Sequence, residues 1–287
     1  MSDGFSLIDL KGISKPITKL IDSVSKGIGA IYEPVSKVRN AKAEAKAMLI
    51  LAEAQNAVGD VSSRALERVN YREIRRQNNI DSIVKGAVGV LPSQVSTEEV
   101  DEDWIVNFFD LAQDVGNAEM QKIWSKLLAG EVSKPGSYSP RTLNVVKSLT
   151  PKDAHMFTTL CGFSFLIKNG SYFDRVFPVF SYDTILFVRA NGVSVAVETH
   201  LMNIGLLSSV NLWYGPNERG SKKVHLKYFS EEYYTVPDVE EEDDEFASLQ
   251  AFSFTDVGEE LFHISGAEPN AEFIKVLLRG SDLFVCP

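Results

Sequence analysis

The clearest helix signals lie in residues 103–157, DWIVNFFDLAQDVGNAEMQKIWSKLLAGEVSKPGSYSPRTLNVVKSLTPKDAHMF. Apolar residues recur three or four positions apart in this stretch, which places them on one face of each helix. A helical core is therefore predicted here. Its first helix buries Trp104, Ile105, Phe108, Phe109 and Ala112, and its second helix buries Met120, Ile123, Trp124, Leu127 and Leu128.

Two further helices in the same stretch have well-marked starts. Ser139 precedes Pro140 and Thr150 precedes Pro151, so a capping hydroxyl stands before a proline at the first helical position each time. Asp153, at the third helical position of the second, completes a capping box. The sequence predicts consecutive helices over residues 141–149 and 151–166.

Before this core, a basic amphipathic helix is predicted from residue 10 to residue 31. Apolar residues three or four positions apart form one face, and lysines occupy the opposite side. Ser14 and Pro16 fit an N-cap and a first-turn proline, and Pro34 ends the helix or bends the chain. The apolar face consists of Leu10, Ile13, Ile17, Leu20, Ile21, Val24, Ile28 and Ile31, and the basic face of Lys11, Lys15, Lys19 and Lys26.

Two roles fit this amphipathic helix. At a membrane, the apolar face would enter the headgroup boundary while each lysine contributes on the order of 1 kcal/mol against anionic lipid. In a packed structure, the same face would contact a neighbouring helix or other copies in an oligomer, and the lysines would face water. Packing is the more usual role of such a face, and membrane contact is the alternative.

Two more helices are predicted between residues 36 and 90. Residues 36–58 are rich in alanine, which has the highest helix propensity. Residues 62–90 contain a stripe of arginines four positions apart, Arg64, Arg68, Arg72 and Arg76. This arginine stripe could bind nucleic-acid phosphates, or it could pair with the acidic C-terminal region or with Glu67 and Glu73. Pairing is favoured because acidic residues dominate the rest of the chain.

The charge distribution supports that preference. The 287 residues include 29 basic and 39 acidic side chains, a net charge of −10. Residues 1–90 contain 14 basic and 10 acidic side chains, and the remaining residues contain 15 and 29. Such a balance argues against a protein that coats nucleic acid with excess positive charge. Two cysteines cannot form a disulfide scaffold and no signal peptide is seen, so a cytoplasmic protein is predicted. No apolar run of about 18 residues occurs, so no membrane span is predicted.

Residues 103–157, together with LIDLKGISKPITKLIDSVSKGIGAIYEP at 7–34 and AKAEAKA at 41–47, resemble a bacterial family of unknown function found in prophages and mobile elements. The pattern WSKLLAGE followed by SLTPKDAHMF is similar to that of the Abi-alpha group of abortive-infection proteins. The resemblance covers roughly residues 5–165. It implies a setting in the conflict between bacteria and phage, and it carries over no catalytic residue.

After Lys168 the apolar period shortens towards two, which is typical of strands. Strands are predicted at 175–180, 184–189, 209–214, 223–229 and 247–254, and helices at 195–207, after Thr255 and at 270–278. The segments LMNIGLLSS and FSFTDVGEELFHI are similar to winged-helix domains. The corresponding recognition helix would contain Val197, Glu198, Thr199, His200 and Asn203. It has no arginine or lysine, which argues against DNA binding.

No catalytic, cofactor or metal motif stands out. The histidines His155, His200, His225 and His263 lack ligand spacing, and no phosphate-binding loop or nucleophile elbow occurs. Cys161 is predicted to be a buried, inert thiol. The acidic residues Asp101 and Asp103 complement a helix dipole without needing a metal. An enzyme is therefore not predicted, and no cofactor is expected.

Together these observations predict a mainly α-helical protein with a C-terminal α+β part. A helical N-terminal region (1–95) and a helical central domain (96–168) precede a winged-helix-like domain (169–287). We expect a non-enzymatic phage-defence protein that self-assembles as a homo-oligomer, senses a phage or host protein, and acts in the cytoplasm or at the inner face of the membrane. The alternative is a DNA-binding regulator that uses the C-terminal domain and the arginine stripe.

Overall fold

The computed structural model describes residues 14–29, 60–169, 172–179, 182–214, 224–235, 249–280 and 284–285. The predicted helix 36–58 lies outside these residues, as do Leu10, Lys11, Ile13 and Ile31. The chain divides into two compact units, Met1–Lys147 (unit 1) and Ser148–Pro287 (unit 2), whereas the sequence suggested three regions. Unit 1 thus combines the N-terminal helices with most of the predicted central domain.

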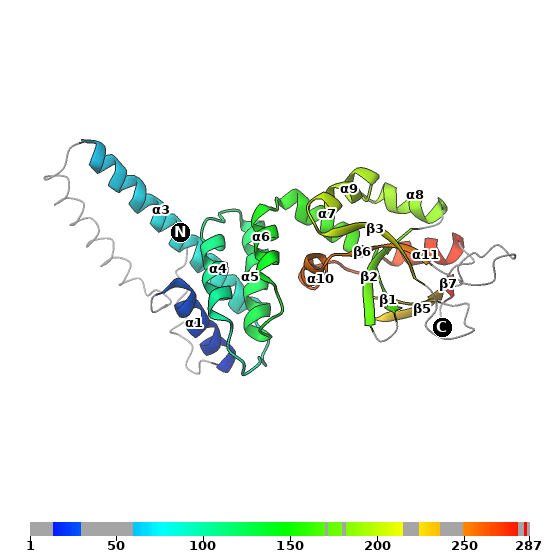
Figure 1. The fold of residues 1–287 in the computed structure, drawn as a ribbon, viewed down its shortest axis with the longest axis horizontal. Helices are drawn as coiled ribbons and strands as arrows, with labels where there is room; N and C mark the ends of the chain where they lie inside the picture. The colour runs from blue at the N-terminus through cyan, green and yellow to red at the C-terminus, as the bar shows by residue number, and fades with distance from the viewer. Residues whose placement is uncertain are drawn as a thin grey trace. The chain divides into compact units, whose positions relative to one another are not determined.

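The described part of unit 1 is helical (Figure 1). Helix α3 packs mainly against α5, and α1 packs against α4 and α5. An aromatic cluster fills the space between α4 and α5: the Phe108 ring lies 5.3 Å from Trp104 and 5.2 Å from Trp124, centroid to centroid. The helices are α1 (Lys15–Ile28), α3 (Asp60–Val90), α4 (Glu102–Ala112), α5 (Ala118–Ser133) and α6 (Pro140–Ser148).

Local capping signals explain where these helices begin. Asp101 accepts a hydrogen bond from the Trp104 backbone N–H at 2.8 Å and so caps α4. Asn117 caps α5 by accepting from the N–H groups of Glu119 and Met120. The Trp104 indole N–H also donates to the Tyr138 carbonyl at 2.7 Å, which fixes the loop before α6. The Asn117 cap thus fixes the end of the α4–α5 turn.

Unit 2 contains all the strands that the structure describes, and the chain is therefore a mixed α+β protein. Its antiparallel sheet has the order β3-β6-β2-β1-β4-β5-β7. The strands are β1 (Phe165–Asn169), β2 (Tyr172–Pro178), β3 (Leu207–Tyr214), β4 (Val224–Tyr228), β5 (Glu231–Thr235), β6 (Leu249–Phe254) and β7 (Phe284–Val285). The helices are α7 (Pro151–Cys161), α8 (Tyr182–Ala190), α9 (Val195–Asn203), α10 (Asp256–Phe262) and α11 (Ala271–Gly280).

The predicted strand 184–189 is wrong, because these residues form most of α8. Their β-branched and aromatic side chains suggested a strand, but Thr184 and Val188, one helical turn apart, are both buried. Phe187 meets Phe273 of α11, with ring centroids 6.5 Å apart. Packing against α11 thus overrides the local propensity. The sequence also extended α7 to residue 166, whereas the chain turns at Gly162 and β1 begins at Phe165.

Candidate functional site

The most unusual surface of unit 1 is the first half of α3. The helix has 31 residues and its partner α5 has 16, so at 1.5 Å per residue they span about 46 Å and about 24 Å. No side chain from residue 61 to residue 78 is buried, whereas Asn79, Ile80 and Ile83 are. Figure 1 shows α3 extending away from α4 and α5. We call residues 60–78 the α3 arm.

The α3 arm carries exposed apolar side chains. They lie on the same side of the helix as the side chains that are buried in the second half of α3. About five full turns of α3 separate Leu66 from Val84, and the same length separates Val69 from Ala87. Because the separation is a whole number of turns, each pair shares one side of the helix. Val84 is 1% and Ala87 0% exposed, whereas Leu66 is 37% and Val69 42% exposed. The core-forming stripe therefore continues onto the arm, beyond the reach of α5.

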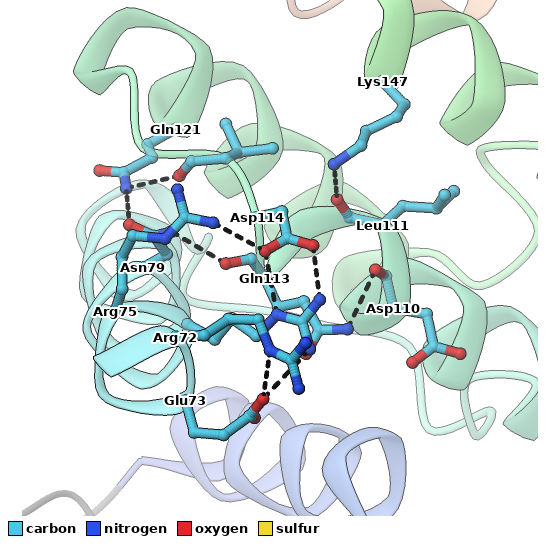
Figure 2. Close-up of polar contacts among 12 residues, drawn as sticks. Arg72, Glu73, Arg75, Asn79, Asp110, Leu111, Gln113, Asp114, Gln121 and Lys147 are labelled. Carbon is cyan, nitrogen blue, oxygen red and sulfur yellow. Dashed lines mark hydrogen bonds and ion pairs between the residues drawn. The ribbon is translucent and has the colours of Figure 1, made fainter. Parts of the chain in front are cut away.

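The arginine stripe of α3 contacts the turn between α4 and α5 at Asp114 (Figure 2). Arg76 donates from Nε to Asp114 Oδ1 at 2.9 Å and from Nη2 to Oδ2 at 2.8 Å. Arg75 reaches the same Oδ1 at 3.1 Å. Glu73 accepts from Arg72 at 2.9 Å and from Arg76 at 3.4 Å. Intramolecular pairing, one of the two roles weighed for the stripe, is realised at Arg72 and Arg76.

The electrostatics of this cluster follow from that geometry. The hydrogen bond from Arg76 holds the pKa of the Asp114 carboxyl below its usual value, although partial burial opposes the shift. The same contact raises the pKa of Arg76. Asn79 donates to the Gln113 carbonyl at 2.8 Å, and Lys147 donates to the Leu111 carbonyl at 2.7 Å, so the turn is tied down from two sides. The arm is thereby anchored at its base.

Two arginines of the stripe lie farther out. The Arg64 and Arg68 side chains are exposed on the arm, beyond the Asp114 cluster. Unit 1 has 19 basic and 19 acidic side chains in total, and unit 2 has 10 and 20. Unit 2 therefore accounts for the whole net charge of −10. An arm rich in arginine and a strongly acidic unit occur in the same chain.

The apolar face of α1 is covered within unit 1. Leu20 and Val24 are 0% exposed, and Ile17, Ile21 and Ile28 are half-buried. Gly27 approaches α4 so closely that a Cβ there would lie 2.6 Å from Phe109 and 2.9 Å from Ile105. The described part of this face is thus used for helix packing.

The lysines of α1 border a cavity of about 720 Å³ between α1 and residues 95–100. Lys19 Nζ donates to the Ser96 carbonyl at 2.9 Å, and burial lowers its pKa. Lys26 pairs with Glu99 at 2.6 Å, a hydrogen bond that raises the pKa of Lys26 and lowers that of Glu99. Lys15 also borders the cavity and is exposed. With Asp22 and Glu99 in the lining, this cavity has mixed charge.

In unit 2, the predicted recognition helix is α9. Glu198 is buried and pairs with Arg189 of α8 through both carboxylate oxygens. His200 Nε2 lies 2.6 Å from Asp153 of α7. Burial would raise the pKa of Asp153, but hydrogen bonds from Thr150 and His200 hold it below its usual value. The charged groups of α9 thus serve contacts within unit 2, and Val197 is buried while Thr199 and Asn203 are exposed.

Among the residues that the structure describes, no group of three or more His, Cys, Asp or Glu side chains could hold a metal ion. None of the described helices has the length and apolar character to cross a membrane. Cys161 is buried, and burial raises the pKa of its thiol, which disfavours a nucleophilic role. Asp101 caps α4, as its position before the helix predicted.

Sequence reasoning found the arginine stripe and noted Arg75 on the same helix, but it did not include Arg75 in the stripe and missed Asp114. Asp114 lies 38 residues after Arg76, in a turn whose local sequence reveals no distant partner. Arg75 lies next to the stripe and shares its carboxylate. The sequence alone would also have given the net charge of unit 2, by counting its acidic and basic residues, if the boundary between Lys147 and Ser148 had been known.

The family model described as "Protein of unknown function (DUF2806)" matches residues 63–278, which includes most of the α3 arm and nearly all of unit 2. No curated protein and no solved structure matches the chain.

Proposed function

The chain belongs to the DUF2806 family of proteins of unknown function, and we propose from its own geometry that it is a non-enzymatic assembly protein whose α3 arm binds a second copy of the chain. The observation that carries this proposal is the apolar stripe of the arm, which is core-like in residue type and exposed in position. Exposed apolar stripes of this kind are typical of interaction surfaces.

Charge supports a second copy as the partner. The arm combines Leu66 and Val69 with five arginines and three acidic residues, so it favours a surface that is both apolar and acidic. Unit 2 of another copy, with 20 acidic and 10 basic side chains, offers that charge. Arginine pairs well with carboxylates at interfaces because its planar guanidinium can form two hydrogen bonds at once. The arm continues from the packed half of α3 and is held at its base by Asp114, so it extends from the other helices of unit 1.

The test is the particle mass by sedimentation equilibrium for wild type and two matched variants. Leu66→Glu/Val69→Glu places carboxylates in the stripe, and Ile74→Glu makes the same kind of change on a different side of the helix. We expect the wild type and Ile74→Glu to form oligomers, and the double variant to sediment at the monomer mass of 31.8 kDa. A wild type that stays monomeric at all concentrations would contradict self-assembly.

The biological setting that we propose is phage defence. It rests on the resemblance of residues 5–165 to a prophage family and to the Abi-alpha group. In this setting, the chain would respond to phage infection by assembling through the α3 arm. Cells that express wild type or Ile74→Glu should lower the plating efficiency of phage, and cells that express Leu66→Glu/Val69→Glu should not. Normal plating on the wild type across a panel of phages would contradict this setting, whereas the sedimentation result tests assembly separately.

A DNA-binding regulator is the second candidate, and one observation favours it. Strands β2, β6 and β3 are neighbours in that order, and α8 and α9 lie between β2 and β3 in the chain. This order supports the winged-helix-like domain that the sequence suggested. We infer a winged-helix-like core from this order. Against DNA binding, α9 contains no lysine or arginine and unit 2 has a net charge of −10.

Fluorescence anisotropy with labelled duplex DNA separates the two candidates. We expect no binding by wild type at moderate salt and no change in Arg64→Glu/Arg68→Glu. Affinity that falls steeply with salt and is lost in that variant would favour the regulator.

A further inference from the structure

Strand β3 forms one edge of the unit 2 sheet. It pairs with β6 on its inner side, and no described strand pairs with its outer side. Its eight residues, LSSVNLWY, include no charged residue and no proline. Proteins usually protect a long edge strand with such residues or with β-bulges, because its free N–H and C=O groups can pair with another chain. The pairing of β3 with β6 is irregular between Leu207 and Asn211 and regular from Asn211 to Tyr214. Among the described residues, nothing pairs with the outer edge of 211–214, and this regular half of β3 is therefore the candidate for strand addition.

The pairing pattern shows which backbone groups of β3 face outward. Val179 N–H donates to the Gln250 carbonyl at 2.9 Å, so the backbone groups of Gln250 point towards β2. Those of Ala251, the next residue, point towards β3, where Ala251 lies opposite Leu212. The backbone of Leu212 thus bonds to β6. Because directions alternate along a strand, the N–H and C=O groups of Asn211 and Trp213 face the free edge.

Two large apolar side chains of β3 are exposed beside this edge. Val210 is 56% and Leu212 42% exposed. Leu212 lies in the regular part of the strand, and Val210 lies next to it, at the end of the irregular part. An added strand would place its alternate side chains next to them, which gives the contact both main-chain hydrogen bonds and an apolar component.

Charge decides between the candidate occupants of the edge. A second unit 2 would bring another net charge of −10 against this one, and the neutral β3 strand would not offset that repulsion. A basic segment would instead be attracted to unit 2. We propose that the outer edge of β3 binds an extended, basic segment of a protein partner, which adds to the sheet as an antiparallel or parallel strand. This proposal is independent of the α3 arm.

The probe for the test is the acetylated, amidated peptide KVTVKVTVK, with EVTVEVTVE as its acidic counterpart. Binding to the full chain is measured by fluorescence anisotropy, and hydrogen exchange reports the amides of Asn211 and Trp213. We expect the basic peptide to bind at least about tenfold more tightly than the acidic one, the order of one charge-assisted contact, and to slow exchange at both amides. Equal binding of the two peptides, or binding without protection of β3, would overturn the proposal.

Two variants locate the contact. Asn211→Pro removes an outward N–H and leaves the Leu212 ladder to β6 in place, and it should weaken binding about tenfold. If Asn211→Pro does not fold, Val210→Lys tests the same edge by adding a like charge, with Val210→Thr as its matched control. Unchanged affinity in Val210→Lys would contradict the site. An oligomer mass that falls in Val210→Lys, but not in Leu66→Glu/Val69→Glu, would identify a second copy as the occupant and overturn the basic partner.

Discussion

Arg76 of α3 forms a bidentate ion pair with Asp114, at 2.9 Å from Nε to Oδ1 and 2.8 Å from Nη2 to Oδ2. The pair joins the long helix to the α4–α5 turn at the point where α3 leaves the core: Ile80 is buried, and Ile74 is 48% exposed. Because a bidentate contact fixes orientation as well as distance, it holds the base of the α3 arm against the α4–α5 turn.

Asp114→Asn tests this anchor through its pH dependence. The folded pKa of Asp114 lies below the unfolded value of about 3.9, so its charge stabilises the fold above that pH. This stability is lost as the pH falls through the folded pKa. Wild type should therefore melt at a higher temperature than Asp114→Asn at pH 7, and the two should converge below about pH 4. A gap that persists at low pH would mean that the carboxylate charge is not its source.

Gly86→Ala tests the close approach of α3 to α5. A Cβ at Gly86 would lie 2.3 Å from Ser125 Oγ, and that hydroxyl is already committed to the Ile83 and Gln121 carbonyls. Overpacking should cost about 1–3 kcal/mol in the free energy of unfolding, measured by urea denaturation.

Gly89→Ala is the matched control, because a Cβ at Gly89 meets nothing within 4 Å. It should stabilise the helix by less than the roughly 0.5–1 kcal/mol expected in a helix interior, because Gly89 lies one residue before the end of α3. Equal effects of the two alanines would show that α3 and α5 are farther apart than described.

Glu259→Gln tests the buried charge of unit 2. Arg175 is 8% exposed, its guanidinium lies 3.2 Å from the Phe262 ring centroid, and Glu259 is 3.3 Å from its Nε. Burial lowers the pKa of Arg175, and Glu259 offsets part of that shift. Removing the counter-charge should cost about 2–4 kcal/mol of unfolding free energy. Glu272→Gln, which breaks the exposed pair with Lys275, should leave the unfolding midpoint unchanged.

Vesicle sedimentation tests the membrane role of α1. With Leu20 and Val24 fully buried, the described apolar face is not available to lipid while unit 1 stays folded. Wild type and Lys15→Ala/Lys19→Ala should therefore remain equally in the supernatant with phosphatidylglycerol vesicles. Co-sedimentation of wild type that is lost in the double variant would contradict the packing role and restore membrane contact.

The sequence predicted best where the signal is local. The capping box of Thr150 and Asp153 is present, and Thr255 caps α10 by accepting from Gly258 N–H at 3.1 Å, as the residue types predicted. Both signals lie within a single helical turn and depend on short-range hydrogen bonds. The amphipathic pattern of α1 likewise identified Leu20 and Val24 as facing a partner.

The sequence failed where distant packing decides. The run TILFVR at 184–189 has strand-like residues, yet contact with α11 makes it helical. Strand β5 was missed because EEYYT begins with two exposed acidic residues, which are not typical of a strand. It is a strand because it pairs with β4 and β7. At the candidate site, the arginine stripe was visible and its partner Asp114 was not, since nothing in the turn around Asp114 marks a contact with a helix so far away in the chain.

The most direct test of the central claim is hydrogen exchange of residues 61–78 as a function of protein concentration. If a second copy covers the α3 arm, amide protection in these residues should rise with concentration in wild type and Ile74→Glu, and stay low in Leu66→Glu/Val69→Glu. Protection at 80–87, where α5 already covers α3, should stay constant. Exchange in 61–78 that does not change with concentration would contradict assembly through the α3 arm.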